Sequence, residues 1–134
     1  MTAIQILENN SLSKTQSRQD ILELLMQSNV ALSEEEIKKQ LSRNCDRATI
    51  YRNLKKFTKT GILHRLITDD LKTRYMIKKY PEEHLHFKCD DCGNVMCLTQ
   101  INIGNYELPE GFEKKESNFL IIGTCANCKN TSNV

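Results

Sequence analysis

Four of the six cysteines stand in two CxxC pairs, a spacing that binds metal in many small domains. The first pair is Cys89 and Cys92, the second is Cys125 and Cys128, and 32 residues separate the two pairs. Two residues between thiolates let both sulfurs face one ion while the backbone turns, and Gly93 suits such a turn. Together the pairs predict a closed, tetrahedral four-sulfur zinc site, which is structural rather than catalytic.

The alternative for these pairs is redox chemistry, in which a CxxC thiol is activated at the start of a helix. The sequence pattern places neither pair at the start of a helix, which favours metal binding. The other two cysteines, Cys45 and Cys97, are isolated. We interpret both first as small buried hydrophobic residues.

The charged residues divide the chain into a basic front and an acidic back. Residues 1–80 carry 15 Lys or Arg against 9 Asp or Glu, whereas residues 81–134 carry 4 against 8. The front therefore either contacts a polyanion such as nucleic acid or presents a solvated cationic face. Because no apolar run approaches roughly 20 residues and no secretory signal is evident, we expect a cytoplasmic protein without membrane contact.

Three helices are predicted in the front part. Apolar residues cluster on one helical face between residues 16 and 28. Ser33 and Glu36 form a capping box for a second helix that ends near residue 42. Asp46 is a good N-cap for a third helix, and Gly61 suits the position just after its end.

The third helix has one apolar and one cationic face. Ile50, Leu54 and Phe57 follow helical spacing and form the apolar stripe. Four cations lie away from this stripe: Arg52, Lys55, Lys56 and Lys59. Two strand-like runs follow, at residues 62–68 and 73–77. Such a helix fits a DNA major groove, and three helices followed by a hairpin predict a winged helix-turn-helix.

The back part is predicted to be a small second domain that follows a polar, proline-containing linker at residues 78–83. Gly104, Pro109 and Gly111 argue against a long helix between residues 100 and 116. Three short runs have strand character: residues 84–88, 95–98 and 119–123. The expected fold is α+β, with a DNA-binding domain at residues 1–80 and a small zinc-binding domain at residues 81–134.

Several of these motifs resemble signatures of the ferric uptake regulator family. Residues 48–54, ATIYRNL, resemble its recognition helix, and residues 84–93 resemble its HxHFxCxxCG motif. Arg18 with the run at residues 21–25 and the terminal CxxC after Thr124 also match, so the resemblance covers residues 10–130. It implies a homodimer, joined through an α/β dimerisation domain at residues 81–134, in which a regulatory metal governs the DNA affinity of two winged helices.

The resemblance also implies which residues contact DNA. Tyr51 and Arg52 are expected to contact bases and phosphates, while Lys14 and Arg18 are expected to contact the phosphate backbone of the DNA beside the recognition helix. The remaining expected contacts are made by Arg47, Thr49, Lys55, Lys56 and Lys59.

The regulatory metal site departs from the family pattern. Ala31 stands where iron-type members have a histidine, Met76 where many members have a ligand in the wing, and Thr124 where many have a histidine. Leu85 replaces a common aspartate, and residues 80–83 replace a histidine-rich stretch.

The three histidines of the chain remain as candidate regulatory ligands. His84 and His86 alternate along a strand and face one way, so they can chelate one ion. His64, near a ligand position of zinc-type members, could complete the site by joining the wing to the back part. A fourth ligand could come from Glu83, Cys97 or Glu107. Such a ligand set favours zinc over iron, and the alternative is that these histidines sense no metal.

The resulting hypothesis is a repressor of metal-uptake genes, for zinc or iron, that binds an inverted-repeat duplex operator as a homodimer. Besides the structural zinc, it would hold a regulatory Zn²⁺ or Fe²⁺. One alternative is a metal-independent or redox- or peroxide-responsive repressor of the same fold. Another is a zinc-ribbon module that binds RNA or protein, although 6% aromatic residues and no tryptophan offer few stacking platforms. The sequence contains no evident nucleophile–base pair, so we expect neither an enzyme nor a small-molecule substrate.

Overall fold

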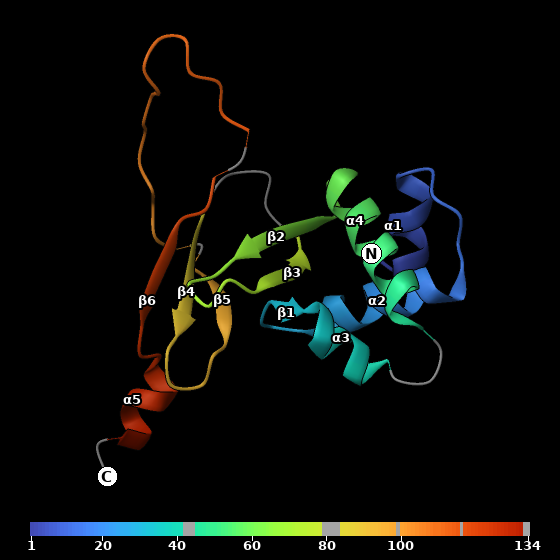
Figure 1. Cartoon of the computed structure of the whole chain (residues 1–134), viewed down its shortest axis with the longest axis horizontal. Coiled ribbons are helices and arrows are strands. Elements are labelled where there is room, and N and C mark those ends of the chain that lie inside the picture. Colours follow the sequence, from blue (N-terminus) through green and yellow to red (C-terminus); the bar gives the residue numbers. More distant parts are fainter. Residues whose placement is uncertain (42–44, 79–83, 99, 116, 133–134) are drawn as a thin grey trace. The chain divides into compact units, whose positions relative to one another are not determined.

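The computed structural model of the chain describes residues 1–41, 45–78, 84–98, 100–115 and 117–132 (Figure 1). Its contacts divide the chain into two compact units, Met1–Lys79 and Tyr80–Val134. Each unit contains a three-stranded sheet, so the chain has the predicted α+β architecture. None of the described helices is both long and apolar enough to cross a bilayer.

The helices of the first unit begin where a side chain accepts a backbone N–H. The described helices are α1 (Ala3–Asn9), α2 (Gln16–Gln27), α3 (Glu34–Gln40) and α4 (Arg47–Lys59). Ser33 and Glu36 form the predicted capping box of α3, and Asp46 accepts from the Thr49 amide at the start of α4. After α4, Gly61 adopts the left-handed conformation, with φ of 84°, that glycine tolerates best. The three predicted helices are therefore confirmed.

Helix α1 was not predicted from the sequence. Thr2 and Gln5 form a capping box at its start, and Ala3 and Leu7 are buried against the core. A seven-residue helix has too few turns to be stable by itself, so its formation depends on this packing.

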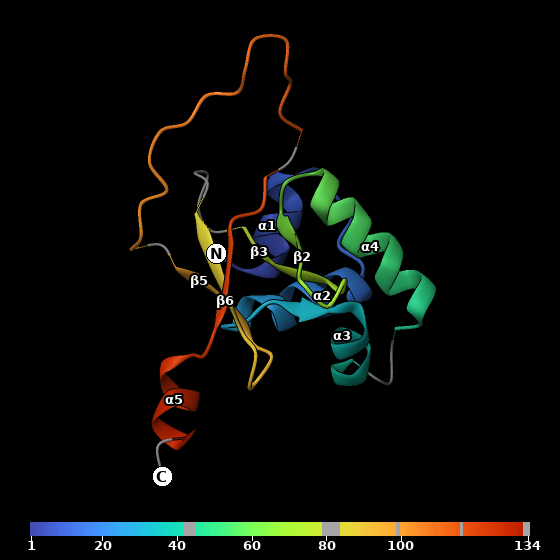
Figure 2. The ribbon, with the colours of Figure 1, turned by 60° about the vertical axis from the view of Figure 1, so that its left-hand side comes forward.

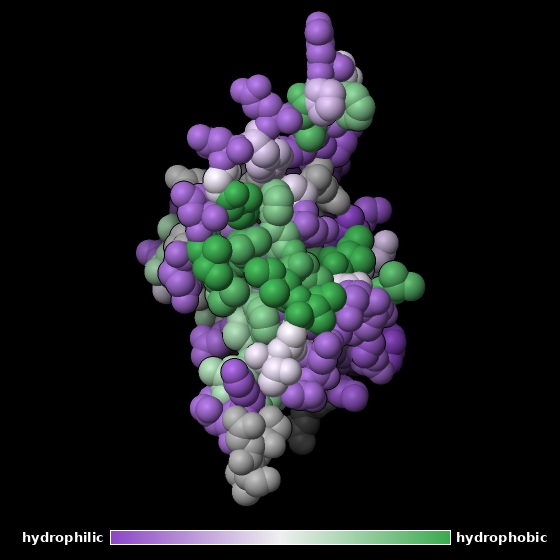
Figure 3. Space-filling model, turned by 90° about the vertical axis from the view of Figure 1, so that its left-hand side faces the viewer, coloured by the Kyte–Doolittle hydropathy of each residue, from purple (hydrophilic) through white to green (hydrophobic). Residues whose placement is uncertain are grey.

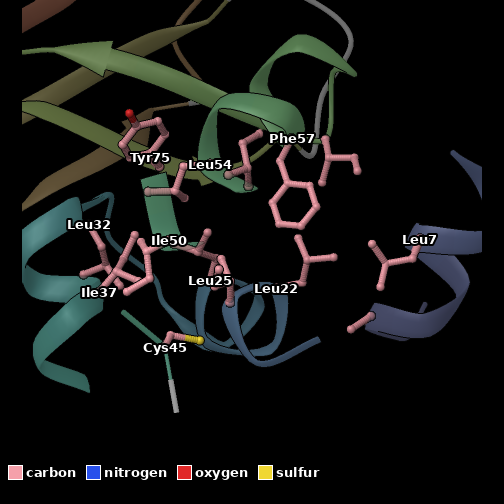
Figure 4. Packing of buried hydrophobic residues seen from close by; sticks show 14 residues of the cluster. Leu7, Leu22, Leu25, Leu32, Ile37, Cys45, Ile50, Leu54, Phe57 and Tyr75 are labelled. Atoms are coloured by element: carbon pink, nitrogen blue, oxygen red, sulfur yellow. The ribbon is translucent and has the colours of Figure 1, made fainter. Parts of the chain in front are cut away.

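The core of the first unit joins α2, α3 and α4 (Figure 4). Leu22 of α2, Ile37 of α3 and the predicted stripe of α4 are fully buried, and Figure 4 shows the ring of Phe57 above Leu22. The stripe consists of Ile50, Leu54 and Phe57. Because these residues fill the core, they fix which face of α4 points outward.

A small sheet completes the winged helix. The strands β1 (Leu32–Ser33), β2 (Leu63–Ile67) and β3 (Thr73–Ile77) pair antiparallel in the order β1-β3-β2, which confirms the predicted hairpin. At the tip of this wing, buried Arg74 pairs with Asp70 at 3.2 Å and donates to the Thr68 hydroxyl. The Thr68 hydroxyl donates to Asp70 in turn. This hydrogen bond is the main reason why the Asp70 pKa lies well below its usual range, and the backbone amide of Lys72 and the side chain of Arg74 lower it further. The turn is thus tied to the strand that follows it.

The second unit is built on a short central strand. β4 (Leu85–Cys89) pairs antiparallel with β5 (Val95–Leu98) and parallel with β6 (Leu120–Gly123), and α5 (Ala126–Ser132) follows. The three predicted strands are confirmed. A Cβ on Gly123 would lie 3.3 Å from the Phe87 ring, so a glycine lets β6 pass closely beside that ring.

The connection from β5 to β6 leaves apolar surface exposed. Residues 101–115 form neither helix nor strand, which agrees with the prediction that no long helix forms there, and they expose Ile101, Tyr106, Leu108 and Phe112. Ile121 and Ile122 of β6 are both exposed although neighbouring strand residues point to opposite faces. Figure 3 views the side of the second unit that carries β6 and shows hydrophobic side chains gathered there. Surface of this kind is typical of a protein–protein interface.

Truncation of the α4 stripe should destabilise the first unit. Leu54 is fully buried, so Leu54→Ala should lower the free energy of unfolding by about 2–5 kcal/mol through lost burial and a cavity. Leu71→Ala is the matched control, because Leu71 is 86% exposed and its truncation should change stability by less than about 0.5 kcal/mol. Urea unfolding of both variants measures the difference, and equal midpoints would contradict the assigned packing.

Candidate functional site

The two CxxC pairs converge on one point in the second unit. Cys89 ends β4, and the parallel pairing of β4 with β6 sets it opposite Gly123, two residues before Cys125. All four sulfurs lie within 4.8 Å of one another, and the Cys92 and Cys125 sulfurs are 4.0 Å apart. A tetrahedral zinc with bonds of about 2.3 Å places its sulfurs roughly 3.8 Å apart. The four cysteines therefore fit a closed zinc site.

The electrostatics of this cluster favour a bound cation. The backbone N–H groups of Cys92 and Cys125 donate to the Cys89 sulfur at 3.5 and 3.3 Å, and they lower the Cys89 pKa to about 6. In contrast, the adjacent Cys125 sulfur raises the pKa of Cys128 to about 12. One thiolate forms readily, but four cannot share this space without repulsion. A dication at the centre would relieve that repulsion.

One sequence argument about these cysteines is wrong. We expected neither pair to open a helix, but α5 begins at Ala126, directly after Cys125. The redox alternative is instead disfavoured by the convergence of all four sulfurs, which a pair of independent redox motifs does not require.

A second cluster combines His84, His86 and Cys97. One ligand atom from each lies within 4.8 Å of the others, and His84 Nε2 is 3.2 Å from the Cys97 sulfur. The centroids of the two imidazole rings are 4.6 Å apart, so the rings lie on one side of the strand, as predicted. His86 is buried, whereas His84 and Cys97 are half-buried. The candidate ligand Cys97 is thus placed with the histidines rather than packed as a simple hydrophobic residue.

The other candidate ligands stand on other segments of the chain. His64 is half-buried on β2 of the first unit, where it pairs with Met76. Glu107 is exposed in the connection to β6 and does not join the cluster within the described part of the chain. Glu83 lies outside the described residues.

Helix α4 presents its cations to solvent. Opposite the buried stripe, Tyr51 is 51% exposed, and Thr49 is half-buried and accepts from Arg52 at 3.4 Å. Figure 2 shows α4 along the outside of the first unit. The exposed cations on this helix are Arg47, Arg52, Lys55, Lys56 and Lys59. The predicted cationic face is therefore available to a ligand.

The side chain of Arg18 braces α4 rather than extending freely from α2. Its Nε donates to Asn53 Oδ1 at 3.1 Å, and its Nη1 donates to the Ser13 hydroxyl at 2.9 Å. Lys14 pairs with Glu8 at 2.8 Å on the surface. Sequence analysis missed Asn53, although a polar residue within an apolar helix stripe is a signal for such a buried contact.

Loss of one sulfur should release zinc from the closed site. Cys89→Ser should abolish the tightly bound zinc and unfold the second unit, because structural zinc contributes on the order of 10–16 kcal/mol in small domains. Asp91→Ser is the matched control, since Asp91 is exposed in the same turn and belongs to neither metal cluster. Metal analysis and thermal unfolding of both variants test this. An unchanged zinc content in Cys89→Ser would rule out the assignment.

Three comparisons with known proteins bear on these sites. Residues 9–119 match the profile of the Ferric uptake regulator family. The peroxide operon regulator of Bacillus subtilis is 26% identical over 138 residues, covering 98% of this chain and 94% of that protein. The ferric uptake regulator of Vibrio cholerae has a TM-score of 0.66 at 25% identity, covering 90% of this chain and 98% of that one.

A zinc uptake regulator solved with zinc and DNA has a TM-score of 0.72 at 18% identity and covers 98% of this chain and 93% of that one, which shows a shared fold. The family profile spans well over half of the chain, including α2 to β3 and the first CxxC pair. The chain belongs to the ferric uptake regulator family of DNA-binding transcription regulators.

Proposed function

We propose that the chain is a cytoplasmic, homodimeric repressor whose affinity for an inverted-repeat operator depends on a regulatory metal, and that it controls metal-uptake genes. The observation that carries the proposal is the cationic outer face of α4, held outward by a fully buried stripe on the opposite side. This helix is 13 residues long, and a helix of this shape fits the major groove.

The proposed DNA contacts lie on the outer face of α4 and beside that helix. Arg52 and Tyr51 project from the outer face and are assigned to bases and phosphates, together with Arg47, Thr49, Lys55, Lys56 and Lys59. Lys14 is assigned to the phosphate backbone. Arg18 holds α4 through its hydrogen bond to Asn53, and we assign its remaining N–H groups to the phosphate backbone of the DNA.

The proposed dimer uses the second unit. Among the described residues, β6 is hydrogen-bonded only to β4, so its outer edge can pair with another strand. Exposed Ile121 and Ile122 flank this edge, and Phe112 and Leu108 of the preceding connection add apolar surface. Two copies joined here would carry two winged helices, which is what an inverted-repeat operator requires.

The proposed regulatory metal is zinc or iron, bound by His84 and His86 with His64 as the ligand from the first unit. A ligand from each unit would favour one arrangement of the two winged helices over others, so metal binding would shift the population towards the DNA-binding state. Cys97 and Glu83 are candidates for the remaining position. The metal-independent alternative predicts the same DNA affinity with and without metal.

A redox-responsive repressor is the second candidate. It is favoured by the B. subtilis relative, which is named for peroxide control, and by the Cys97 sulfur beside His84. The RNA-binding alternative has no comparable support, because the family profile and the exposed face of α4 both point to duplex DNA.

Removal of the Arg52 side chain should weaken operator binding. Arg52→Ala should lose about 1–3 kcal/mol, or roughly 5- to 150-fold in Kd, if the guanidinium contacts a guanine. Lys115→Ala is the control, because its side chain is 82% exposed but lies in the second unit. Fluorescence anisotropy with a palindromic duplex at fixed salt gives both constants. Equal affinity of Arg52→Ala and the parent protein would remove Arg52 from the interface.

The regulatory site should act separately from the closed zinc site. Added zinc should tighten operator binding by the parent chain but not by His84→Ala, because only the second cluster is altered. Both proteins should retain one zinc per chain at the four cysteines. Metal analysis and titrations with and without zinc provide the test, and an equal response of both proteins to zinc would show that His84 is not a regulatory ligand.

A further inference from the structure

The wing ends in a large apolar side chain that projects into solvent. Leu71 lies in the turn between β2 and β3 and is 86% exposed, the highest value among the large hydrophobic residues of the described chain. Ile67, the last residue of β2, adds a second apolar side chain that is 44% exposed. A single exposed leucine needs no functional explanation, so the significance of Leu71 depends on how the backbone holds it.

The backbone of Leu71 is in the left-handed region, with φ of 63°. This region is crowded for a residue with a Cβ and is usually occupied by glycine or asparagine, so a leucine there is strained. The Leu71 amide donates to the Thr68 carbonyl at 2.9 Å on one side of the turn. On the other side, the Lys72 amide donates to the Asp70 carboxylate at 3.1 Å, and Asp70 also pairs with Arg74. Strain that is held by such a network is found mostly at functional sites.

The charges at the tip indicate what kind of surface Leu71 meets. The Asp70 carboxylate is turned back into the hairpin, where it accepts from Thr68 and Arg74. The formal charges of residues 68–74 cancel, because two carboxylates oppose Lys72 and Arg74. The tip therefore offers an apolar side chain rather than a cluster of cations, and leucine is one of the side chains that proteins insert between base steps in the DNA minor groove.

The middle of the wing lies near the outer face of α4. Tyr75 of β3 pairs with Arg65 of β2. Burial is the main cause of the raised pKa of Tyr75, followed by the charge of Glu34. The ionisable groups of Arg65 and Tyr51 also lie close enough to act on the Tyr75 hydroxyl, and Tyr51 belongs to the outer face of α4. Wing and helix therefore face DNA together.

The length of the wing matches the spacing of the DNA grooves. β2 begins just after α4 and leads away from the end of that helix (Figure 1). Its five residues rise by about 3.3 Å each, so its tip lies roughly 16 Å from its base. Half a turn of B-DNA, which separates a major groove from the next minor groove, is roughly 17 Å. With α4 in a major groove, Leu71 can reach the adjacent minor groove.

We propose that Leu71 is an apolar wedge that enters the minor groove beside α4 and partly unstacks one base step of the operator. Wedges of this kind kink the duplex by about 20–90°. Unstacking costs least at flexible pyrimidine–purine steps such as TA, so the wedge selects sequence at a step that no side chain reads by hydrogen bonding. The inference rests on the proposed binding of duplex DNA and adds a contact in a second groove.

Fluorescence of 2-aminopurine tests the unstacking directly. The probe is a duplex selected from a random pool by the zinc-loaded full chain, with 2-aminopurine placed at each adenine in turn. The parent chain should raise the fluorescence at one step beside each α4 contact. Leu71→Asn should abolish this increase and bind about 3- to 30-fold more weakly, because apolar burial is lost but unstacking is no longer required. Asparagine is similar in size to leucine and tolerates the left-handed region, so the turn should stay folded.

Two further variants separate the wedge from a general effect on the protein. Leu71→Met keeps an apolar side chain and should restore the fluorescence increase. Ile4→Asn is the matched control, because Ile4 is 41% exposed on α1, is assigned to no contact and undergoes the same change from apolar to amide. It should leave affinity and fluorescence unchanged. A parent complex without the increase, or a Leu71→Asn complex that keeps it, would overturn the proposal.

Replacement of the affected base step tests the predicted selectivity. The parent chain should bind a duplex with TA at this step several-fold more tightly than one with a stiff AA step, and Leu71→Asn should lose the preference. If Leu71→Asn instead loses only the assembly of several copies on longer duplexes, Leu71 contacts another protein copy and the wedge is wrong. If Arg52→Ala weakens binding but Leu71→Asn does not, the proposed function stands and this inference fails. A parent chain that selects no duplex would refute both.

Discussion

The convergence of four sulfurs at the junction of β4 and β6 is the constraint on which the second unit depends. Among the described residues, its fully buried apolar side chains are Cys89 and Val95, whereas the first unit buries a continuous cluster from α1 to β3. A unit with so small a core cannot offset the conformational entropy of its chain by apolar burial alone. A cation shared by two distant segments would supply the missing stabilisation and close a loop of more than thirty residues.

Strand β4 links the four-cysteine cluster to the second cluster of candidate ligands. Its five residues include His86 and end at Cys89, and His84 precedes its first residue. Any displacement of the strand would therefore disturb both sets of ligands. A zinc bound at the four cysteines would fix β4 at one end, where the strand also pairs with β6, and would thereby help to hold the two histidines and Cys97 within 4.8 Å of one another. Such preorganisation reduces the entropy lost when a cation binds.

In the first unit, the packing and hydrogen bonds fix the orientation of one helix, α4. The buried residues Ile50, Leu54 and Phe57 anchor α4 in the core. The hydrogen bond from Arg18, near the start of α2, to Asn53 connects α4 to α2. Polar contact within an otherwise apolar interface restricts sliding and rotation of α4 against its neighbours. The cations on the outer face consequently project from a fixed helix.

The sequence by itself determined the features that depend on local chemistry. The CxxC spacing, the caps at Ser33 and Asp46, the stripe of α4 and the shared strand face of His84 and His86 were all predicted, because each involves residues only a few positions apart. Only the tertiary structure decided the features that depend on contacts between distant segments. The α1 helix forms through burial of Leu7, and Asn53 meets Arg18 from 35 residues away. Cys97 becomes a partner of His86 through the β4–β5 register, and the sequence pattern did not reveal that α5 follows Cys125. Periodicity shows which way a side chain points, but the residue it meets is set by packing and strand register.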